Sequence, residues 1–305
     1  MNGLLARDLV VVTGKGGVGK STVAAGLGLV AARRGLRTIV AEVSARDDVS
    51  RALGGEDAEH EQELLPGLHH ISVDPQTAME EYLVDQLPSR ALADLLTSSR
   101  TFTYLTAATP GMRELLTIGK VWDLAQDQRR TGERAYDLVV LDAPATGHGL
   151  AVLGAPRTFG EVALAGPIAR QARTIDAMLT DPARTGVVAV ARPEEMPVSE
   201  ALDLERVLQA ELGVAVELFV VNGLLPDRFT DADARTLAAA ARGDAVRAAL
   251  AAHERARSQR PELSRLRRHG RAPVATLPFL FDAVLSPDGL STLADRLERV
   301  LSWPR

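Results

Sequence analysis

A glycine-rich segment near the start of the chain restricts the possible folds more than any other feature. GKGGVGKST (14–22) follows an apolar run at 8–13 and precedes a stretch that predicts a helix from Lys20 to Arg34. It matches the phosphate-loop pattern G-x-x-x-x-G-K-[ST] in the strand–loop–helix context that this pattern requires. Such glycines let backbone N–H groups turn toward a phosphate, and the helix N-terminus adds its positive end. The segment therefore predicts an α/β protein that binds a nucleoside triphosphate.

The side chains of this loop predict the ligands ATP and Mg²⁺. Lys20 would reach the β- and γ-phosphate oxygens, the Ser21 hydroxyl would coordinate Mg²⁺, and Thr22 would reach the α-phosphate. A second lysine, Lys15, follows the first glycine and marks the deviant form of the loop. The predicted nucleotide-binding residues are Gly14, Lys15, Gly16, Gly17, Val18, Gly19, Lys20, Ser21 and Thr22.

The rest of the chain alternates short apolar runs with longer helical patterns, which is typical of a mostly parallel sheet flanked by helices. Besides 8–13, the predicted strands are 37–43, 69–73, 136–142, 186–191, 214–222 and 272–278. Two helical stretches, about 75–133 and 155–181, interrupt this rhythm. Because ligands bind at the carboxyl edge of such a sheet, we expect these insertions to form a helical subdomain over that edge. We expect residues 1–305 to form a single P-loop domain.

The composition excludes several kinds of chemistry. The chain has no cysteine, so disulfides, thiolate-bound zinc, iron–sulfur clusters and cysteine nucleophiles are all excluded. Its formal net charge of −5 argues against broad binding to nucleic acid. It has no signal-peptide pattern and no run of eighteen apolar residues, so we expect a cytoplasmic protein. Only three of the 35 basic residues are lysines, and two of these lie in the glycine loop.

Several further segments resemble one family. LDAPATGHGLAVL (141–153) resembles the second switch, D-T-A-P-T-G-H, of the arsenical-pump-driving ATPases and the targeting factors for tail-anchored membrane proteins. PGMRE (110–114), VVNGLLP (220–226) and LPFLFDAVL (277–285) also match that family in character, so the resemblance spans nearly the whole chain. It implies a Mg²⁺-dependent, ATP-hydrolysing dimeric switch whose nucleotide state is coupled to a partner or a hydrophobic client.

The resemblance also implies roles for individual residues. Asp142 would hold Mg²⁺ through water, and Lys15 would cross a dimer interface to the nucleotide of the facing subunit. Asn222 would read the adenine edge. The catalytic residues that it implies are Lys15, Lys20 and Asp142, and the metal-binding residues are Ser21 and Asp142. The base would contact Asn222, Pro278 and Phe279. Gly147 and His148 would belong to the segment that moves when the γ-phosphate leaves.

The first switch departs from the family pattern. EVSARDD (42–48) stands where the family has D-P-A, so the position of the water-orienting aspartate is occupied by Ser44. A serine hydroxyl cannot act as a carboxylate base, so hydrolysis would be slow unless Asp47 or Asp48 substitutes, with help from Glu42. One alternative is therefore a hydrolysis-poor nucleotide-binding subunit that pairs with an active paralogue. Both a homodimer and a heterodimer stay open.

A second alternative is a chromosome-partition or division-site-placement ATPase, which shares the deviant loop. The partition type needs a basic DNA-binding face, for which the candidates are Arg255, Arg257, Arg260, Arg265, Arg267, Arg268 and Arg271. The placement type needs an amphipathic membrane helix, but the polar face of 288–303 mixes acids and arginines. We therefore expect that helix to pack on the sheet. We expect no nucleic-acid binding and no membrane insertion, and the partner stays an unidentified protein client or membrane protein.

Overall fold

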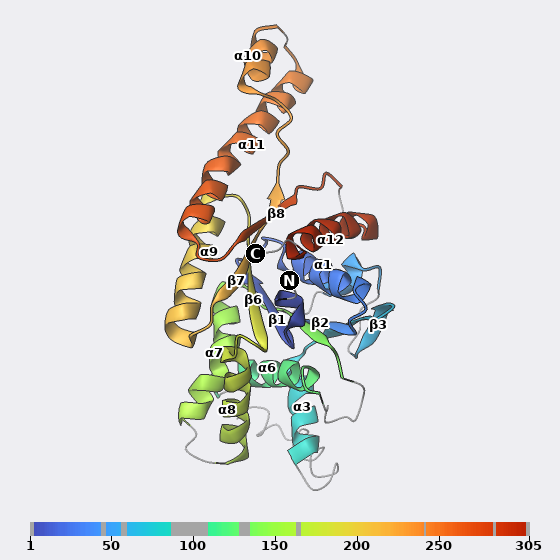
Figure 1. The fold of residues 1–305 in the computed structure, drawn as a ribbon, viewed down its shortest axis with the longest axis vertical. Helices are drawn as coiled ribbons and strands as arrows, with labels where there is room; N and C mark the ends of the chain where they lie inside the picture. The colour runs from blue at the N-terminus through green and yellow to red at the C-terminus, as the bar shows by residue number, and fades with distance from the viewer. Residues whose placement is uncertain are drawn as a thin grey trace.

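The computed structural model describes residues 3–43, 47–55, 60–86, 109–127, 135–162, 166–240, 242–282 and 285–302. These residues form one eight-stranded sheet with helices on both faces (Figure 1). The strands are β1 (Leu9–Gly14), β2 (Thr38–Glu42), β3 (Gln62–Leu65), β4 (Leu68–Ser72), β5 (Leu138–Asp142), β6 (Thr185–Ala191), β7 (Val216–Leu224) and β8 (Val274–Pro278). Their order across the sheet is β3-β4-β2-β5-β1-β6-β7-β8, and only β3 and β4 pair antiparallel.

Helices separate most of these strands along the chain. They are α1 (Lys20–Arg33), α2 (Asp48–Ala52), α3 (Pro75–Gln86), α6 (Met112–Leu124), α7 (Thr146–Val162), α8 (Pro167–Thr180), α9 (Glu195–Val207), α10 (Asp231–Ala240), α11 (Asp244–His269) and α12 (Pro287–Leu301). A 3₁₀ turn (Leu4–Ala6) precedes β1, and a π-helical turn (Leu208–Leu212) extends α9.

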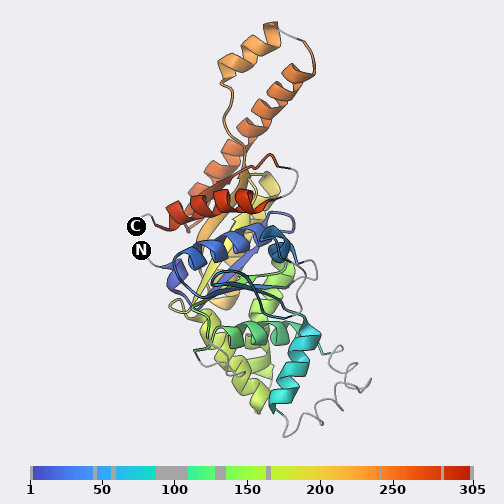
Figure 2. The ribbon, with the colours of Figure 1, turned by 90° about the vertical axis from the view of Figure 1, so that its right-hand side faces the viewer.

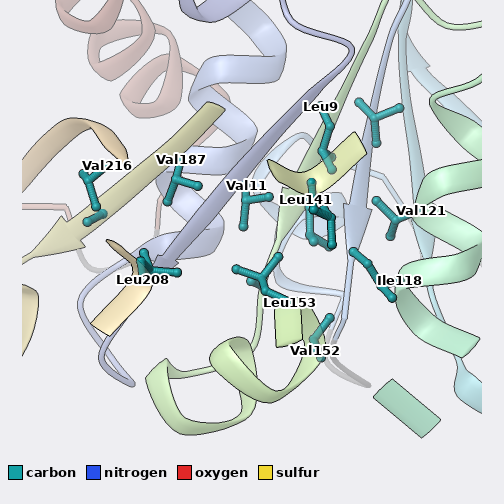
Figure 3. Packing of buried hydrophobic residues seen from close by; sticks show 14 of the residues in the cluster. Leu9, Val11, Ile118, Val121, Leu141, Val152, Leu153, Val187, Leu208 and Val216 are labelled. Carbon is teal, nitrogen blue, oxygen red and sulfur yellow. The ribbon is translucent and has the colours of Figure 1, made fainter. Parts of the chain in front are cut away.

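The centre of the sheet is buried on both faces, which explains why β1, β5 and β6 are nearly continuous apolar runs. In β1, Leu9 and Val11 point into one core and Val10 and Val12 into the other, and all four side chains are fully buried. Figure 3 shows part of the first core, where residues of the strands meet Ile118 and Val121 of α6. The mostly parallel sheet flanked by helices is therefore confirmed.

All seven predicted strands are present in the structure, within one or two residues of the expected limits. The predicted helix from Lys20 ends at Arg33, and Gly35 follows with φ +83°, as a helix C-terminus favours. The eighth strand, β3, was not predicted. It forms an antiparallel edge hairpin with β4 and adds nothing to the nucleotide edge of the sheet.

Helices α3, α6, α7 and α8 pack on one another at one end of the molecule (Figure 1). They come from the ranges in which a helical subdomain was predicted, but residues 87–108 and 128–134 of those ranges lie outside the described residues. The division of the chain into a single domain with this subdomain stays a prediction. At the opposite end, α10 and the first half of α11 project beyond the sheet as a hairpin (Figures 1 and 2).

Helix α12 lies against α1, as both views show (Figures 1 and 2). Leu290, Leu293 and Leu297 are at most 2% exposed, so its apolar face is covered by protein. This helix was expected to pack on the sheet, and it does contact β8, but its main contact is α1. In the described part of the chain, no helix is both long enough and apolar enough to span a membrane.

Candidate functional site

The glycine loop connects β1 to α1 at the carboxyl edge of the sheet. Gly14, Gly17 and Gly19 have φ values of +148°, +79° and +94°, in the region that only glycine adopts freely. A side chain at Gly14 would also collide with the main-chain oxygen of Val190 on β6. The local sequence therefore produces the tight turn that directs the amides of this loop and the first turn of α1 toward a bound anion.

Asn222 on β7, which β6 separates from β1 in the sheet, contacts this loop. Its side-chain amide donates a hydrogen bond to the main-chain oxygen of Val18, with an N···O distance of 3.0 Å. A Cβ at Gly19 would collide with the same amide, so the two segments are in close contact. The residue that the resemblance assigns to the base thus lies directly beside the phosphate loop.

Lys20 and Ser21 begin α1 and face β5. The Lys20 ammonium donates to the main-chain oxygen of Lys15 at 3.3 Å, across the mouth of the loop. Burial lowers the pKa of Lys20, while the negative charge of Asp142 opposes this change. The Ser21 hydroxyl donates a hydrogen bond to the Asp142 carboxylate. The predicted catalytic lysine, metal-binding serine and metal-binding aspartate therefore share one small volume.

Asp142 is the last residue of β5 and is only 5% exposed. Its Oδ1 atom has no hydrogen-bond partner among the described residues. The pKa of Asp142 is raised to about 7, mainly by burial and also by the charges of Glu42 and Asp48, against the opposing effects of Ser21 and Lys20. A buried carboxylate with an unpaired oxygen is unfavourable unless a cation compensates it, so these residues fit Mg²⁺.

Glu42, at the end of β2, anchors the start of α2. It is fully buried, and its two carboxylate oxygens accept hydrogen bonds of 3.0 Å from the main-chain N–H groups of Asp48 and Val49. Its Oε2 also lies 3.3 Å from Nε2 of the buried His70. These contacts commit Glu42 to holding the first-switch segment in place.

The two aspartates of the first switch differ in their partners. Asp48 forms an ion pair of 2.5 Å with Arg51 on the same helix. Asp47 has φ +48°, the only positive φ of a non-glycine residue in the described part of the chain, and its Oδ1 has no partner there. The predicted Ser44 position lies outside the described residues.

The second switch passes from β5 into α7. Gly149 lies close to the preceding turn, because a Cβ there would be 2.9 Å from the Pro144 main-chain oxygen and 3.2 Å from Thr13 Oγ1. Gly147 and His148, which the resemblance places in a moving segment, are exposed in the first turn of α7. Their positions are consistent with movement of that turn, which stays a prediction.

Lys15 contacts two residues that no pattern in the sequence predicts as its partners. Its ammonium forms an ion pair of 2.5 Å with Glu200 and lies 3.4 Å from Sδ of Met196, both on α9. The two charged side chains are 32% and 39% exposed, and Met196 is 63% exposed. No local pattern connects residues 185 positions apart, so only the packing of α9 beside the loop reveals this contact.

A pocket of about 740 Å³ opens beside the end of β7 and β8. Gly223 and Phe279 line it, and the main-chain N–H of Phe279 donates to the oxygen of Leu224 at 2.9 Å. The rings of Phe279 and Phe281 meet edge to face at 5.0 Å, and Arg228 lies 4.4 Å above the Phe281 ring. Pro278 ends β8 next to this aromatic wall. The pocket therefore offers flat apolar surfaces of the kind that stack with a base.

The arginine-rich part of α11 is partly neutralised. Arg257 pairs with Asp231 at 3.0 Å, and Arg260 pairs with Asp227. Arg265 pairs with Glu262 at 3.2 Å. These contacts to neighbouring acids favour the expectation that this stretch is not a DNA-binding face.

The class of protein follows from where these groups lie. In the described structure, the lysine at the start of α1 and the carboxylate at the end of β5 face the same glycine turn from two adjacent strands of a parallel sheet. Phosphoryl-transfer sites of P-loop proteins use this arrangement to hold a triphosphate and its metal ion. The chain is a P-loop nucleoside triphosphatase.

Comparison with known proteins gives the particular family. The family model described as "Anion-transporting ATPase" matches residues 7–165 and 166–247, which is most of the chain. The ATPase BagA of Mycobacterium tuberculosis is 29% identical over 254 residues, covering 79% of this chain and 73% of that protein. The arsenical pump-driving ATPase of Acidiphilium multivorum is 26% identical over 73% of this chain and 40% of that protein, and a putative one of Halobacterium salinarum is 28% identical over 72% and 36%. The chain belongs to this ATPase family.

Proposed function

We propose that this ATPase binds ATP with Mg²⁺ at residues 14–22 and acts as a dimeric switch that couples nucleotide state to a protein client. The observation that carries the ATP and metal part is the buried Asp142, whose unpaired oxygen lies beside Ser21 and Lys20. A buried carboxylate that is only partly compensated is typical of a functional site, where a bound cation would supply the missing partner.

The roles of the chain's own residues follow from this geometry. The amides of the loop and of the first turn of α1 bind the β-phosphate, and Lys20 neutralises charge that develops on the transferred phosphoryl group. Ser21 and Asp142 would hold Mg²⁺, which compensates phosphate charge when it is bound. Asn222, Pro278 and Phe279 would orient the base, because Asn222 contacts the loop, and Phe279 and Gly223, the residue after Asn222, both line the pocket.

Lys15 would act in the facing subunit of the dimer. A cation supplied by a second subunit stabilises the charge on the γ-phosphoryl group, as an arginine finger does. Lys15 lies on the exposed rim of the loop beside the exposed Met196, so a second copy can approach it there. Lys15→Ala should leave ATP affinity nearly unchanged but abolish turnover and ATP-linked dimerisation in sedimentation. Unchanged dimerisation of Lys15→Ala would contradict the role in the facing subunit.

The first switch decides how fast this protein hydrolyses ATP. Of the carboxylates near Ser44, Glu42 is bound to α2 and Asp48 is paired with Arg51, whereas Asp47 keeps a free oxygen within the described residues. We therefore place Asp47 first among the candidates that orient water. The alternative is the hydrolysis-poor subunit that pairs with an active paralogue, since Ser44 replaces the family's aspartate. Tight ATP binding with turnover no faster than that of a Lys20→Ala control would favour the alternative.

The client belongs to the same proposal. One relative is named an ATPase ASNA1 homolog and others are named arsenical pump-driving ATPases, but this chain lacks the cysteines that thiolate-bound arsenite or zinc requires. A protein client or membrane partner, engaged by a cytoplasmic homodimer or heterodimer, is therefore the form of coupling that we propose. Affinity capture with ATP and with ADP tests it: a partner retained with only one nucleotide would support coupling, and none in either state would oppose it.

A further inference from the structure

We propose that Glu200 is a positioning residue that holds Lys15 within its own subunit until nucleotide and a second subunit compete for it. The inference rests on the proposed role of Lys15 in the facing subunit and adds its regulation. The Lys15 ammonium contacts Glu200 Oε1 at 2.5 Å and rests against Met196. In the proposed dimer, the ammonium exchanges this close contact with Glu200 for a contact with a phosphate in the facing subunit.

Glu200 is held firmly in this position by its helix. On either side of it, Val198 and Ala201 are at most 3% exposed and pack into the core below the sheet. Arg265 of α11 donates to the main-chain oxygen of Glu195 at 3.1 Å and also to the Ser199 hydroxyl. Since α9 is fixed from two sides, Lys15 moves away from Glu200 when it reaches across to a phosphate in the facing subunit.

The charge of the pair makes it sensitive to nucleotide. Without nucleotide, Glu200 neutralises Lys15 and keeps it beside α9. Bound ATP with Mg²⁺ in a facing subunit offers a more negative acceptor, and the closed dimer then replaces two ion pairs with two contacts to phosphate. Each partly exposed Lys15–Glu200 pair should weaken dimerisation by about two- to five-fold. A symmetric dimer loses two such pairs, so removing them should lower its dissociation constant by roughly four- to twenty-five-fold.

The test compares Glu200→Gln with Asp203→Asn, a matched control on the same helix whose carboxylate pairs with Arg206. Each variant removes one negative charge, but only the first frees Lys15. The first measurement is the rate at which an amine-reactive acylating reagent labels Lys15 in nucleotide-free protein, read by peptide mass spectrometry. Lys120, which is paired with Glu81 at 2.7 Å, serves as the internal reference.

Glu200→Gln should raise the labelling of Lys15 at least two-fold relative to Lys120, and Asp203→Asn should not. The second measurement is the dissociation constant of the dimer, determined by sedimentation in the presence of Mg²⁺ and a non-hydrolysable ATP analogue. It should fall roughly four- to twenty-five-fold in Glu200→Gln and stay near the wild-type value in Asp203→Asn.

The outcomes separate this inference from the proposed function. If Lys15→Ala dimerises as the wild type does, the role of Lys15 in the facing subunit is wrong, whatever Glu200 does. If Lys15→Ala fails to dimerise but Glu200→Gln leaves both labelling and dimerisation unchanged, the proposed function stands and the restraint by Glu200 is wrong. A weaker dimer in Glu200→Gln would also overturn the inference, because Glu200 would then contribute to the interface itself.

Discussion

Replacing Asp142 by Asn should stabilise the nucleotide-free protein while destroying its response to ATP and Mg²⁺. Asn has nearly the same shape as a protonated Asp but carries no charge. Burial raises the pKa of Asp142 from 3.8 to about 7. A pKa shift of that size means that folding disfavours the ionised carboxylate by roughly 4 kcal/mol relative to the protonated one.

The effect depends on pH in a direction that linkage fixes. Because the folded-state pKa of this acid is raised, the folded protein binds more protons than the unfolded chain between about pH 4 and pH 7. The stability of the wild type therefore falls as pH rises through that window and levels off above it. Between pH 5 and pH 8, ionisation of Asp142 should lower the unfolding free energy of the wild type by about 2 to 3 kcal/mol. The Asp142→Asn variant should not show this loss.

Urea unfolding of both proteins at pH 5 and pH 8, without nucleotide or metal, measures this difference. The gain of Asp142→Asn over the wild type should grow by about 2 to 3 kcal/mol between the two pH values. ATP with Mg²⁺ should then raise the unfolding midpoint of the wild type but not that of the variant. A gain that is independent of pH, or a variant that keeps the full stabilisation by ATP and Mg²⁺, would refute the account of this carboxylate.

Three further substitutions test separate parts of the structure. Gly19→Ala should cost about 1 to 3 kcal/mol of unfolding free energy, because residue 19 has a φ of +94°. It should also weaken ATP binding, because the new Cβ would collide with Asn222. Gly213→Ala is the control: its φ is +71° and the space around it is open, so it should lose stability but keep its ATP affinity. Leu297→Ala should cost about 2 to 5 kcal/mol in chemical denaturation, because the leucine is fully buried between α12 and α1; near-zero cost would mean that α12 is not docked. Phe279→Ala should weaken ATP binding by about 1 to 3 kcal/mol in calorimetry but leave tripolyphosphate binding unchanged, and an equal loss for both ligands would remove it from the base site.

The buried parts of the fold were predictable because burial on both faces of a sheet leaves a plain signal. Each central strand is a continuous apolar run, and each was predicted. β3 leaves no such signal, since its residues alternate between half-buried and exposed at the edge of the sheet. The Pro66–Gly67 turn that joins it to β4, with Gly67 at φ +78°, was the one local pattern that could have revealed the hairpin.

The positions of some site residues could also be predicted from the sequence, and those of others could not. The positions of Lys20, Ser21 and Asp142 follow from the strand–loop–helix motif and from the adjacency of β1 and β5. The contact of Asn222 with Val18 and that of Lys15 with Glu200 join segments about 200 residues apart, and only tertiary packing brings them together. Glu42 illustrates the reverse case: as a residue near the predicted first switch it was a candidate for assisting water, but its oxygens accept the amides that begin α2.

The central claim is that a lysine of one subunit completes the ATPase site of the other, and complementation between two inactive variants tests it most directly. Lys15→Ala keeps its own phosphate loop but has no lysine to offer its partner, whereas Lys20→Ala offers Lys15 but cannot complete its own site. In a mixed dimer, the site of the Lys15→Ala subunit is intact. Mixing the two in equal amounts should therefore restore turnover well above that of either variant alone, because each mixed dimer has one working site of two. Turnover that stays at the level of the separate variants, in a mixture shown to contain mixed dimers, would contradict the account.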